Sequence, residues 1–166
     1  MNIFVTDSCP QKSAQALDNK RVVKMVLESA QLLSNAAHIH IPELAPYRKT
    51  HINHPCSIWT AVNQANYQWL LQHFTHLCLE YTHRYNKTHA CEKLHDTFDK
   101  IQYYMENSKI HDNFVNCTIF KEESDVINAY KKALIQKWKN DKLVPNWTNR
   151  NKPEWFYAED LGSCKI

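Results

Sequence analysis

Residues 10–37 read PQKSAQALDNKRVVKMVLESAQLLSNAA, and this stretch decides the fold class. Its apolar residues recur at steps of three and four, which is the period of an amphipathic α-helix. Asp7 and Pro10 are typical of a helix start, because a capping side chain precedes a proline in the first turn. The pattern predicts one long helix ending near Ala37, after a short extended segment over residues 1–9. The apolar members are Ala14, Leu17, Val22, Met25, Val26, Ala30, Leu33 and Ala37.

Prolines separate this helix from a second one. Pro42, Pro46 and Pro55 fall within residues 38–57, and proline is poorly tolerated inside a helix. We expect a long loop there, and long ordered loops in compact domains are often functional. A second helix is predicted from about Ser57 to Tyr85. The side chains expected to face inward are Ile58, Val62, Trp69, Phe74, Leu77 and Tyr81.

The rest of the chain predicts two more helices and a tail. Residues 89–107 carry a weaker apolar stripe, and residues 108–122 form a polar connection. Ser124 can cap a fourth helix, which Pro145 ends. An aromatic tail over residues 143–166 completes the chain. We therefore predict a single all-α domain of about four helices over residues 1–166, with a long His- and Pro-containing loop.

Composition excludes several classes of protein. The chain has 166 residues and one glycine, Gly162, whereas a P-loop or a dinucleotide fingerprint needs several glycines at fixed spacing. Glycine is also favoured in the tight turns of β-hairpins, so an all-β fold is not expected. With 43% apolar residues, the chain can build a core without a metal ion or a disulfide. We expect no metal and no cofactor.

Charge and cysteine usage indicate an intracellular, soluble protein. The six cysteines are scattered without a Cys-x-x-Cys pair, so free and mostly buried thiols are expected. Neither a signal peptide nor an apolar run of membrane-spanning length is present. The net charge of +3 permits a nucleic-acid partner without demanding one. A monomer is expected, in the host cytoplasm or nucleus if the protein is viral.

A polar stripe on the first helix is the first candidate site. Its members share one helix face and are Lys20, Lys24, Glu28 and Gln31. They can form a solvated face, in which a Lys–Glu pair contributes only ~0.2–0.5 kcal/mol. Lysine stands on the N-terminal side of this pair, which is the poorer orientation. The functional interpretation places a carboxylate among cations, as acid–base or electrostatic catalysis requires.

The loop over residues 47–55 is the second candidate site. It concentrates cationic, imidazole and amide groups, the types that bind phosphate oxygens and base edges; they include Arg48, His51, Asn53 and His54. An ordinary hydrogen-bonded loop is the alternative. A zinc site formed by His51, His54 and a distant cysteine lacks any spacing signature.

Aromatic residues beside basic ones form two weaker candidates. Residues 80–89 can be a nucleic-acid surface or a helix end whose cations suit the helix dipole. The tail around Trp155 can stack on bases or cover the core. Asn63 and Asn66 are poor helix formers, so their side chains are expected to face something polar.

The order of these features resembles the pyrimidine-dimer DNA glycosylase superfamily, which includes the phage endonuclease V type and its bacterial relatives. Three motifs carry the resemblance, and they are ESAQLL at 28–33, Tyr47-Arg48 leading to His54-Pro55, and KPEWF at 152–156. The segments DNKRVVKM at 18–25 and THINHP at 50–55 also resemble uncharacterised proteins of phages and other large DNA viruses.

The resemblance implies a mechanism and a set of roles. In this family the N-terminal α-amine attacks C1′ of the damaged nucleotide, a Schiff base forms, and β-elimination can cut the strand. Glu28 would stabilise the cationic sugar and move protons. Arg21, Lys24 and Arg48 would bind phosphates, the His54-Pro55 loop would contact the backbone, and Trp155 would stack.

Two departures from the family pattern concern the reaction centre. The family commonly has Arg directly before the catalytic Glu, whereas this chain has Leu27. Asn2 is bulky, so removal of Met1 should be inefficient. The reacting amine would then belong to Met1, or no α-amine serves and Lys20 or Lys24 replaces it.

The function expected from the sequence is a DNA N-glycosylase with possible lyase activity on damaged or modified pyrimidine nucleotides, a role in DNA repair. Its catalytic residues would be Glu28, Met1 and Lys24. Two alternatives stay open: a nucleic-acid-binding module without catalysis, and a viral enzyme that modifies free nucleotides. Double-stranded DNA or a nucleotide is the expected partner. The other residues expected to bind substrate are Lys20, Arg21, Gln31, Arg48, His51, Asn53, His54, Asn66 and Trp155.

Overall fold

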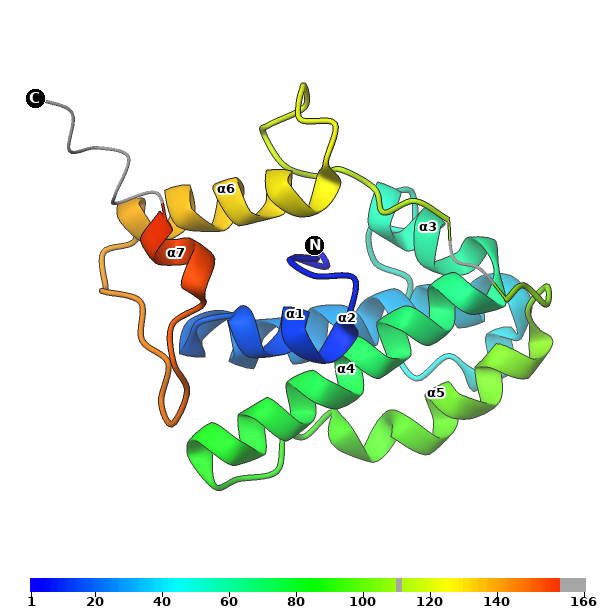
Figure 1. Cartoon of the computed structure of the whole chain (residues 1–166). Helices are drawn as coiled ribbons and strands as arrows, with labels where there is room; N and C mark the ends of the chain where they lie inside the picture. Colours follow the sequence, from blue (N-terminus) through cyan, green and yellow to red (C-terminus); the bar gives the residue numbers. More distant parts are fainter. Residues whose placement is uncertain (110–111, 159–166) are drawn as a thin grey trace, which may run out of the picture.

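Helices form all the regular secondary structure in residues 1–109 and 112–158, which are the residues that the computed structural model describes (Figure 1). The all-α prediction is therefore confirmed. The α-helices are α1 (Pro10–Ala16), α2 (Asn19–His40), α3 (Pro55–Val62), α4 (Gln64–Tyr85), α5 (His95–Ile101), α6 (Val126–Asn140) and α7 (Glu154–Ala158). The short 3-10 helices are η1 (Pro42–Leu44), η2 (Glu92–Leu94) and η3 (Gln102–Tyr104). Gly162, Cys164 and the end of the predicted tail lie outside the described residues.

Two long helices form the centre of the molecule. Helices α2 and α4 each contain 22 residues and pack against each other, with α1 on α4 and α3 on α2 (Figure 1). The apolar positions predicted for the first helix are all buried, as their three- and four-residue spacing requires. Tyr67, Phe74 and Phe98 are among the largest side chains without solvent contact. The apolar core therefore runs along the contact between α2 and α4 and extends to α5.

The N-terminal segment is part of this core. In Figure 1 it lies between α6 and the layer that α1, α2 and α4 form. Ile3 and Val5 are fully buried, and the ring of Phe4 meets that of Tyr130 on α6 at a centroid distance of 6.3 Å. Because this segment is held from both sides, the position of residue 1 is fixed by packing.

The long helix predicted over residues 10–37 is two helices, which corrects the sequence interpretation. Leu17 and Asp18 adopt extended backbone angles between α1 and α2. The carbonyl of Leu17 accepts a hydrogen bond from Arg84, and the buried carboxylate of Asp18 accepts from Arg21 and Trp138. Arg84 belongs to α4 and Trp138 to α6, whereas Arg21 lies in the first turn of α2 itself. Contacts from two other helices therefore support a break in a helix that local periodicity would continue.

The predicted helix over residues 57–85 is also divided. Asn63 is extended, with φ −153° and ψ 168°, and its side chain caps α4 by accepting from the backbone N–H of Asn66. Both asparagine side chains also donate to the carboxylate of Asp112, so the expectation that they face a polar group is met. Ile58 and Val62 are 53% and 47% exposed, so their predicted inward orientation is wrong. The change of direction at Asn63 turns α3 relative to α4 and moves this apolar face outward.

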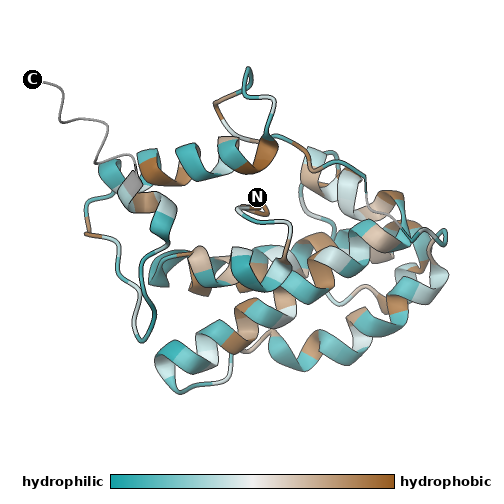
Figure 2. Cartoon of the chain, viewed as in Figure 1, coloured by the Kyte–Doolittle hydropathy of each residue, from teal (hydrophilic) through white to brown (hydrophobic). Residues whose placement is uncertain are grey.

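Helical structure in the rest of the chain is shorter than predicted. Residues 92–104 form η2, α5 and η3 in succession, within the predicted range of 89–107. Helix α6 is capped by Asp125, not Ser124, because the Asp125 carboxylate accepts from the N–H groups of Ile127 and Asn128. It ends at Asn140, before Pro145. Hydrophilic and hydrophobic residues alternate along α6 in Figure 2, as expected for a helix with one buried face.

The cysteines match a further expectation. Cys9, Cys56, Cys78, Cys91 and Cys117 are free thiols, and three of them are buried. Among residues 1–109 and 112–158, no helix is both long enough and apolar enough to cross a bilayer.

Candidate active site

The carboxylate of Glu28 lies beside the start of the chain. Glu28 Oε2 is 4.0 Å from the Met1 nitrogen and accepts a hydrogen bond of 3.0 Å from the backbone N–H of Asn2. Its other oxygen, Oε1, is 3.1 Å from Lys24 Nζ. The Glu28 side chain keeps 14% of its surface exposed, so the carboxylate is partly desolvated yet reachable. A carboxylate and two amines therefore meet at one point.

A tight turn directs the first residue toward Glu28. The side-chain oxygen of Asn2 accepts from the backbone N–H groups of Ile3 and Phe4, at 2.7 and 3.0 Å. Phe4 has a φ of 44°, a left-handed conformation that is unusual for a bulky residue. Burial of the Phe4 ring holds this conformation, because releasing it would expose an aromatic side chain. The sequence analysis did not identify Asn2 as a residue that shapes the site.

The His- and Pro-containing loop is fixed to α2 by a buried amide. Asn35 donates to the Thr50 carbonyl and accepts from the Thr50 N–H, so its amide replaces a missing backbone partner. The same Asn35 nitrogen donates to Ser57 Oγ on α3. Ser57 Oγ lies 3.0 Å from the His51 carbonyl and 3.9 Å from Met1 Sδ. This chain of contacts joins the loop, the first residue and α3, and neither Asn35 nor Ser57 was identified from the sequence.

His54 is the loop residue with the clearest electrostatic link to the amine. Burial is the main cause that lowers the pKa of His54, followed by the positive charges of the amino terminus and His51. The charge of Glu28 acts in the opposite direction. All these groups are thus within electrostatic reach of one imidazole. The Met1 amine lies beside Glu28, and the Ser57 hydroxyl contacts both Met1 Sδ and the His51 carbonyl of the loop.

Other predicted site residues are at least partly exposed to solvent. Lys20 is exposed and pairs with Asp141 at 3.2 Å, one turn of α2 before Lys24. Gln31 is half-buried on the same face of α2. Arg48 and Asn53 are exposed on the loop, and the exposed His51 has a φ of 49°. Cationic and amide side chains on α2 and on the loop over residues 47–55 are therefore available to solvent.

Three residues predicted to bind substrate make contacts with other groups of the protein. Arg21 is buried and pairs with the carboxylates of Asp18 and Asp141. Asn66 is fully buried, where it donates to the Trp59 carbonyl and binds Asp112 through both its nitrogen and its oxygen. Trp155 stacks on Trp138 at 5.4 Å and lines a separate hollow of about 460 Å³ with Lys12, Lys131 and Lys152.

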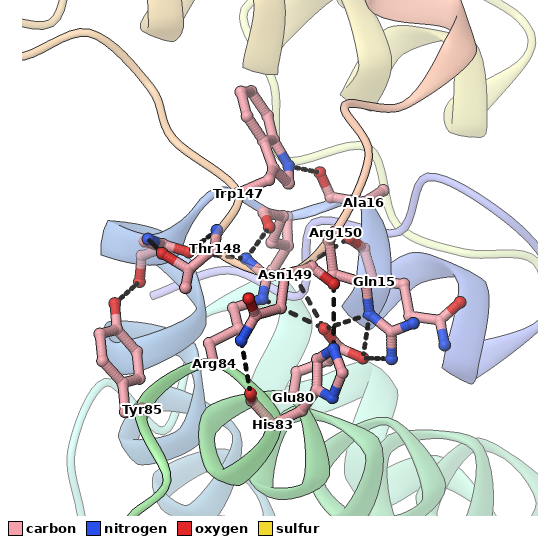
Figure 3. A network of polar contacts seen from close by, with 12 residues as sticks. Gln15, Ala16, Glu80, His83, Arg84, Tyr85, Trp147, Thr148, Asn149 and Arg150 are labelled. Carbon is pink, nitrogen blue, oxygen red and sulfur yellow. Dashed lines mark hydrogen bonds and ion pairs between the residues drawn. The ribbon is translucent and has the colours of Figure 1, made fainter.

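A second carboxylate, Glu80, lies in a buried network at the far end of α4 (Figure 3). Arg84 donates to Glu80 Oε2 from two nitrogens and also to the carbonyls of Leu17 and Gln15. Arg150, from the tail, binds the other Glu80 oxygen at 2.6 Å. The network joins α4, the break between α1 and α2, and the C-terminal segment. It accounts for Glu80 and Arg84 without a nucleic-acid contact.

A comparison with protein families matches residues 1–93 to the family described as pyrimidine dimer DNA glycosylase. The match covers more than half of the 166 residues. The chain belongs to the pyrimidine dimer DNA glycosylase family. No curated protein and no solved structure is significantly similar to it.

The family match covers the whole candidate active site of this glycosylase family member. Met1, Glu28 and the loop containing His54 fall within residues 1–93, as do α1 to α4. Helices α5, α6 and α7 lie beyond the match. The region shared with the family therefore holds the acid and the amine, whereas the remaining helices cover the N-terminal segment and complete the core.

Proposed function

We propose that this protein is a DNA glycosylase that acts on damaged or modified pyrimidine nucleotides, with the α-amine of Met1 as the nucleophile and Glu28 as the catalytic carboxylate. One observation carries the proposal: the Met1 nitrogen and Glu28 Oε2 are 4.0 Å apart, at a partly exposed position. Membership in the pyrimidine dimer DNA glycosylase family supports the type of reaction and a DNA substrate.

The proposed chemistry begins with attack of the Met1 nitrogen on C1′ of the target nucleotide. As the N–C1′ bond forms, the bond from C1′ to the base breaks and the bonding electrons leave with the base. The sugar carries positive charge in this transition state, and the nearby Glu28 carboxylate lowers its energy. Opening of the sugar ring then gives a Schiff base. Loss of the C2′ proton from that intermediate would expel the 3′ phosphate and cut the strand.

The surroundings of Glu28 fit the electrostatics of this reaction. The exposed cations Lys20, Lys24 and Arg48 can neutralise phosphates on either side of the reacting sugar. Lys24 Nζ lies 3.1 Å from Glu28 Oε1, so it is the alternative amine if the chain end does not react. A duplex substrate would need its nucleotide extruded, at a cost of a few kcal/mol.

Borohydride trapping tests the proposal directly. Duplex DNA that contains a pyrimidine dimer or an abasic site is incubated with the protein and borohydride, and the adduct is digested and mapped by mass spectrometry. We expect a covalent adduct on the peptide that begins at Met1. An adduct on Lys24 would show that Lys24, and not Met1, is the nucleophile, and the proposed enzyme class would stand. Absence of both an adduct and base release would refute the proposal.

Matched variants separate catalysis from binding. Glu28→Gln should slow trapping by about a hundredfold while retaining DNA affinity, and Glu43→Gln, an exposed glutamate on η1, is the control. If Glu28→Gln left every DNA-dependent property unchanged and affinity fell steeply with salt, the protein would be a binding module. Strong competition by mononucleotides would instead indicate an enzyme of free nucleotides.

A further inference from the structure

Three potential metal ligands gather beside the amino terminus. The ligand atoms of His54, Cys56 and Cys117 all lie within 4.8 Å of one another. Cys56 is buried in the first turn of α3, whereas Cys117 belongs to the connection before α6. The two cysteines are 61 positions apart in the chain, so no spacing signature in the sequence could reveal them.

We propose that His54, Cys56 and Cys117 form a binding site for a thiophilic divalent cation of the zinc type. The two sulfur atoms are 3.5 Å apart. Two thiolates on one tetrahedral zinc ion, each at about 2.3 Å from the metal, would be about 3.8 Å apart. A disulfide would require about 2.05 Å. The observed separation is therefore close to that of two ligands sharing a metal ion.

The chemistry of the ligand set selects the metal. Thiolate and imidazole ligands favour zinc and its soft neighbours, whereas magnesium and calcium prefer oxygen. Three protein ligands leave one position of a tetrahedral ion open to water or another donor. Ser57, the residue after Cys56, contacts Met1 Sδ at 3.9 Å, so the cluster and the first residue are linked through α3.

Each ligand is held by contacts that require no metal. His54 Nδ1 accepts from the Cys56 N–H at 3.1 Å, which turns a lone pair toward Cys56. A metal ion on Nδ1 would take the place of this capping bond. The N–H of Cys117 donates to Tyr130 Oη, and that hydroxyl donates to the Val115 carbonyl. The buried Tyr130 thus fixes the connection on one side, and α3 fixes Cys56 on the other.

Cobalt binding tests the site without reference to glycosylase activity. The untagged, reduced full chain is titrated with Co²⁺, and thiolate-to-cobalt charge-transfer absorption is recorded. We expect saturation at one ion per chain, with d–d bands typical of tetrahedral coordination, and full displacement by Zn²⁺. A reduced protein that shows no charge-transfer band would overturn the proposal.

Variants identify the ligands. Cys56→Ser, Cys117→Ser and His54→Ala should each weaken Co²⁺ binding by at least about tenfold, whereas Cys9→Ser, a half-buried cysteine outside the cluster, should not. Thermal unfolding in the presence of a chelator establishes that each variant is folded. Unchanged binding in Cys117→Ser would contradict the site, because Cys117 alone joins it to the connection before α6. Metal binding is measured by absorption, and the proposed catalysis is measured by trapping. Either proposal can therefore be refuted while the other one holds.

Discussion

Glu28 and Glu80 are two versions of one local motif with different surroundings. Each lies on a 22-residue helix and pairs with a basic residue four positions away, Lys24 for Glu28 and Arg84 for Glu80. Lys24 has 69% of its side chain exposed, whereas Arg84 has none. The Glu28 side chain keeps 14% of its surface exposed against 4% for Glu80, and two arginines bind the Glu80 carboxylate. Helical spacing creates both pairs, and the burial of the basic partner distinguishes them.

The orientation of each pair agrees with this division. Glu80 precedes Arg84, which is the favourable order along a helix, and Lys24 precedes Glu28 in the unfavourable order. Local stability therefore favours the pair in the buried network. The Glu28 carboxylate has the less favourable partner on its own helix. Its second partner is the amine of Met1, which lies outside α2.

Replacing Glu80 should have the largest effect on stability. Glu80→Gln leaves the buried guanidinium of Arg84 without its counter-charge and weakens the hold on Arg150. Removing one partner of a buried pair costs ~3–5 kcal/mol. We expect the free energy of unfolding in urea to fall by that amount, with Glu43→Gln as the exposed control. A loss below ~1 kcal/mol would mean that the network is dispensable.

Replacing Glu28 should have the opposite profile. Glu28→Gln should lower the rate of base release by about a hundredfold, equivalent to ~3 kcal/mol of transition-state stabilisation. The free energy of unfolding should change by less than ~1 kcal/mol, because the carboxylate is partly solvated and its pairs are weak. Single-turnover assays and urea unfolding measure the two quantities. If both glutamate variants lost stability equally, the contrast between the two sites would disappear.

Acid should destabilise the fold through His73, which lies on α4. Complete burial lowers the pKa of His73 to about 4. In the unfolded chain the imidazole binds a proton near pH 6.5, so the unfolded state holds more protons between these two values. Stability is therefore full above pH 6.5 and falls, by about 2–3 kcal/mol, as the pH approaches 4.

His73→Phe isolates this contribution. The phenyl ring keeps the stacking on Trp69 but loses the hydrogen bond from Nδ1 to the Pro10 carbonyl. We expect a lower stability at pH 7 and a flatter dependence of unfolding free energy on pH. His95→Gln, a half-buried histidine on α5, is the control. An unchanged slope in His73→Phe would assign the acid sensitivity to other groups.

Replacing Lys24 should produce the smallest change in stability. Lys24→Met removes an exposed pair worth ~0.2–0.5 kcal/mol, so thermal unfolding should hardly move. If Lys24 binds a phosphate, the slope of log affinity for DNA against log salt should decrease in magnitude by about 1. A titration of labelled duplex DNA at several salt concentrations measures this slope. No change in the slope would place Lys24 outside the DNA contact.

Helix boundaries show where sequence reasoning reached its limit. Periodicity located the buried faces of α2 and α4, but it continued both helices through Asp18 and Asn63. Asp18 is extended because Trp138 and Arg21 bind its carboxylate, and Asn63 because Asp112 and Asn66 do. Arg21 and Asn66 are local partners, but Trp138 and Asp112 are far from Asp18 and Asn63 in the sequence. A local window therefore contains only part of the contacts that hold the two breaks.

The candidate site also contains residues that the sequence identified and residues that only the structure revealed. Glu28, Met1 and His54 were identified from residue type and family resemblance; the structure places Met1 beside Glu28 and links Met1 to the loop through Ser57. Asn35 and Ser57, which position the loop, carry no chemical signal in the sequence because buried amides and hydroxyls are common. Cys117 reaches Cys56 through a connection whose path depends on Tyr130.

The helical class, the buried faces of the long helices and the candidate site residues can be inferred from the amino-acid sequence, because helical period and functional-group chemistry are local properties. Packing between helices sets where the helices break, which of two similar glutamates is bound by two arginines, and which distant thiols meet. Those outcomes depend on desolvation and on contacts between segments far apart in the chain, and the energies of such contacts exist only once the chain has folded.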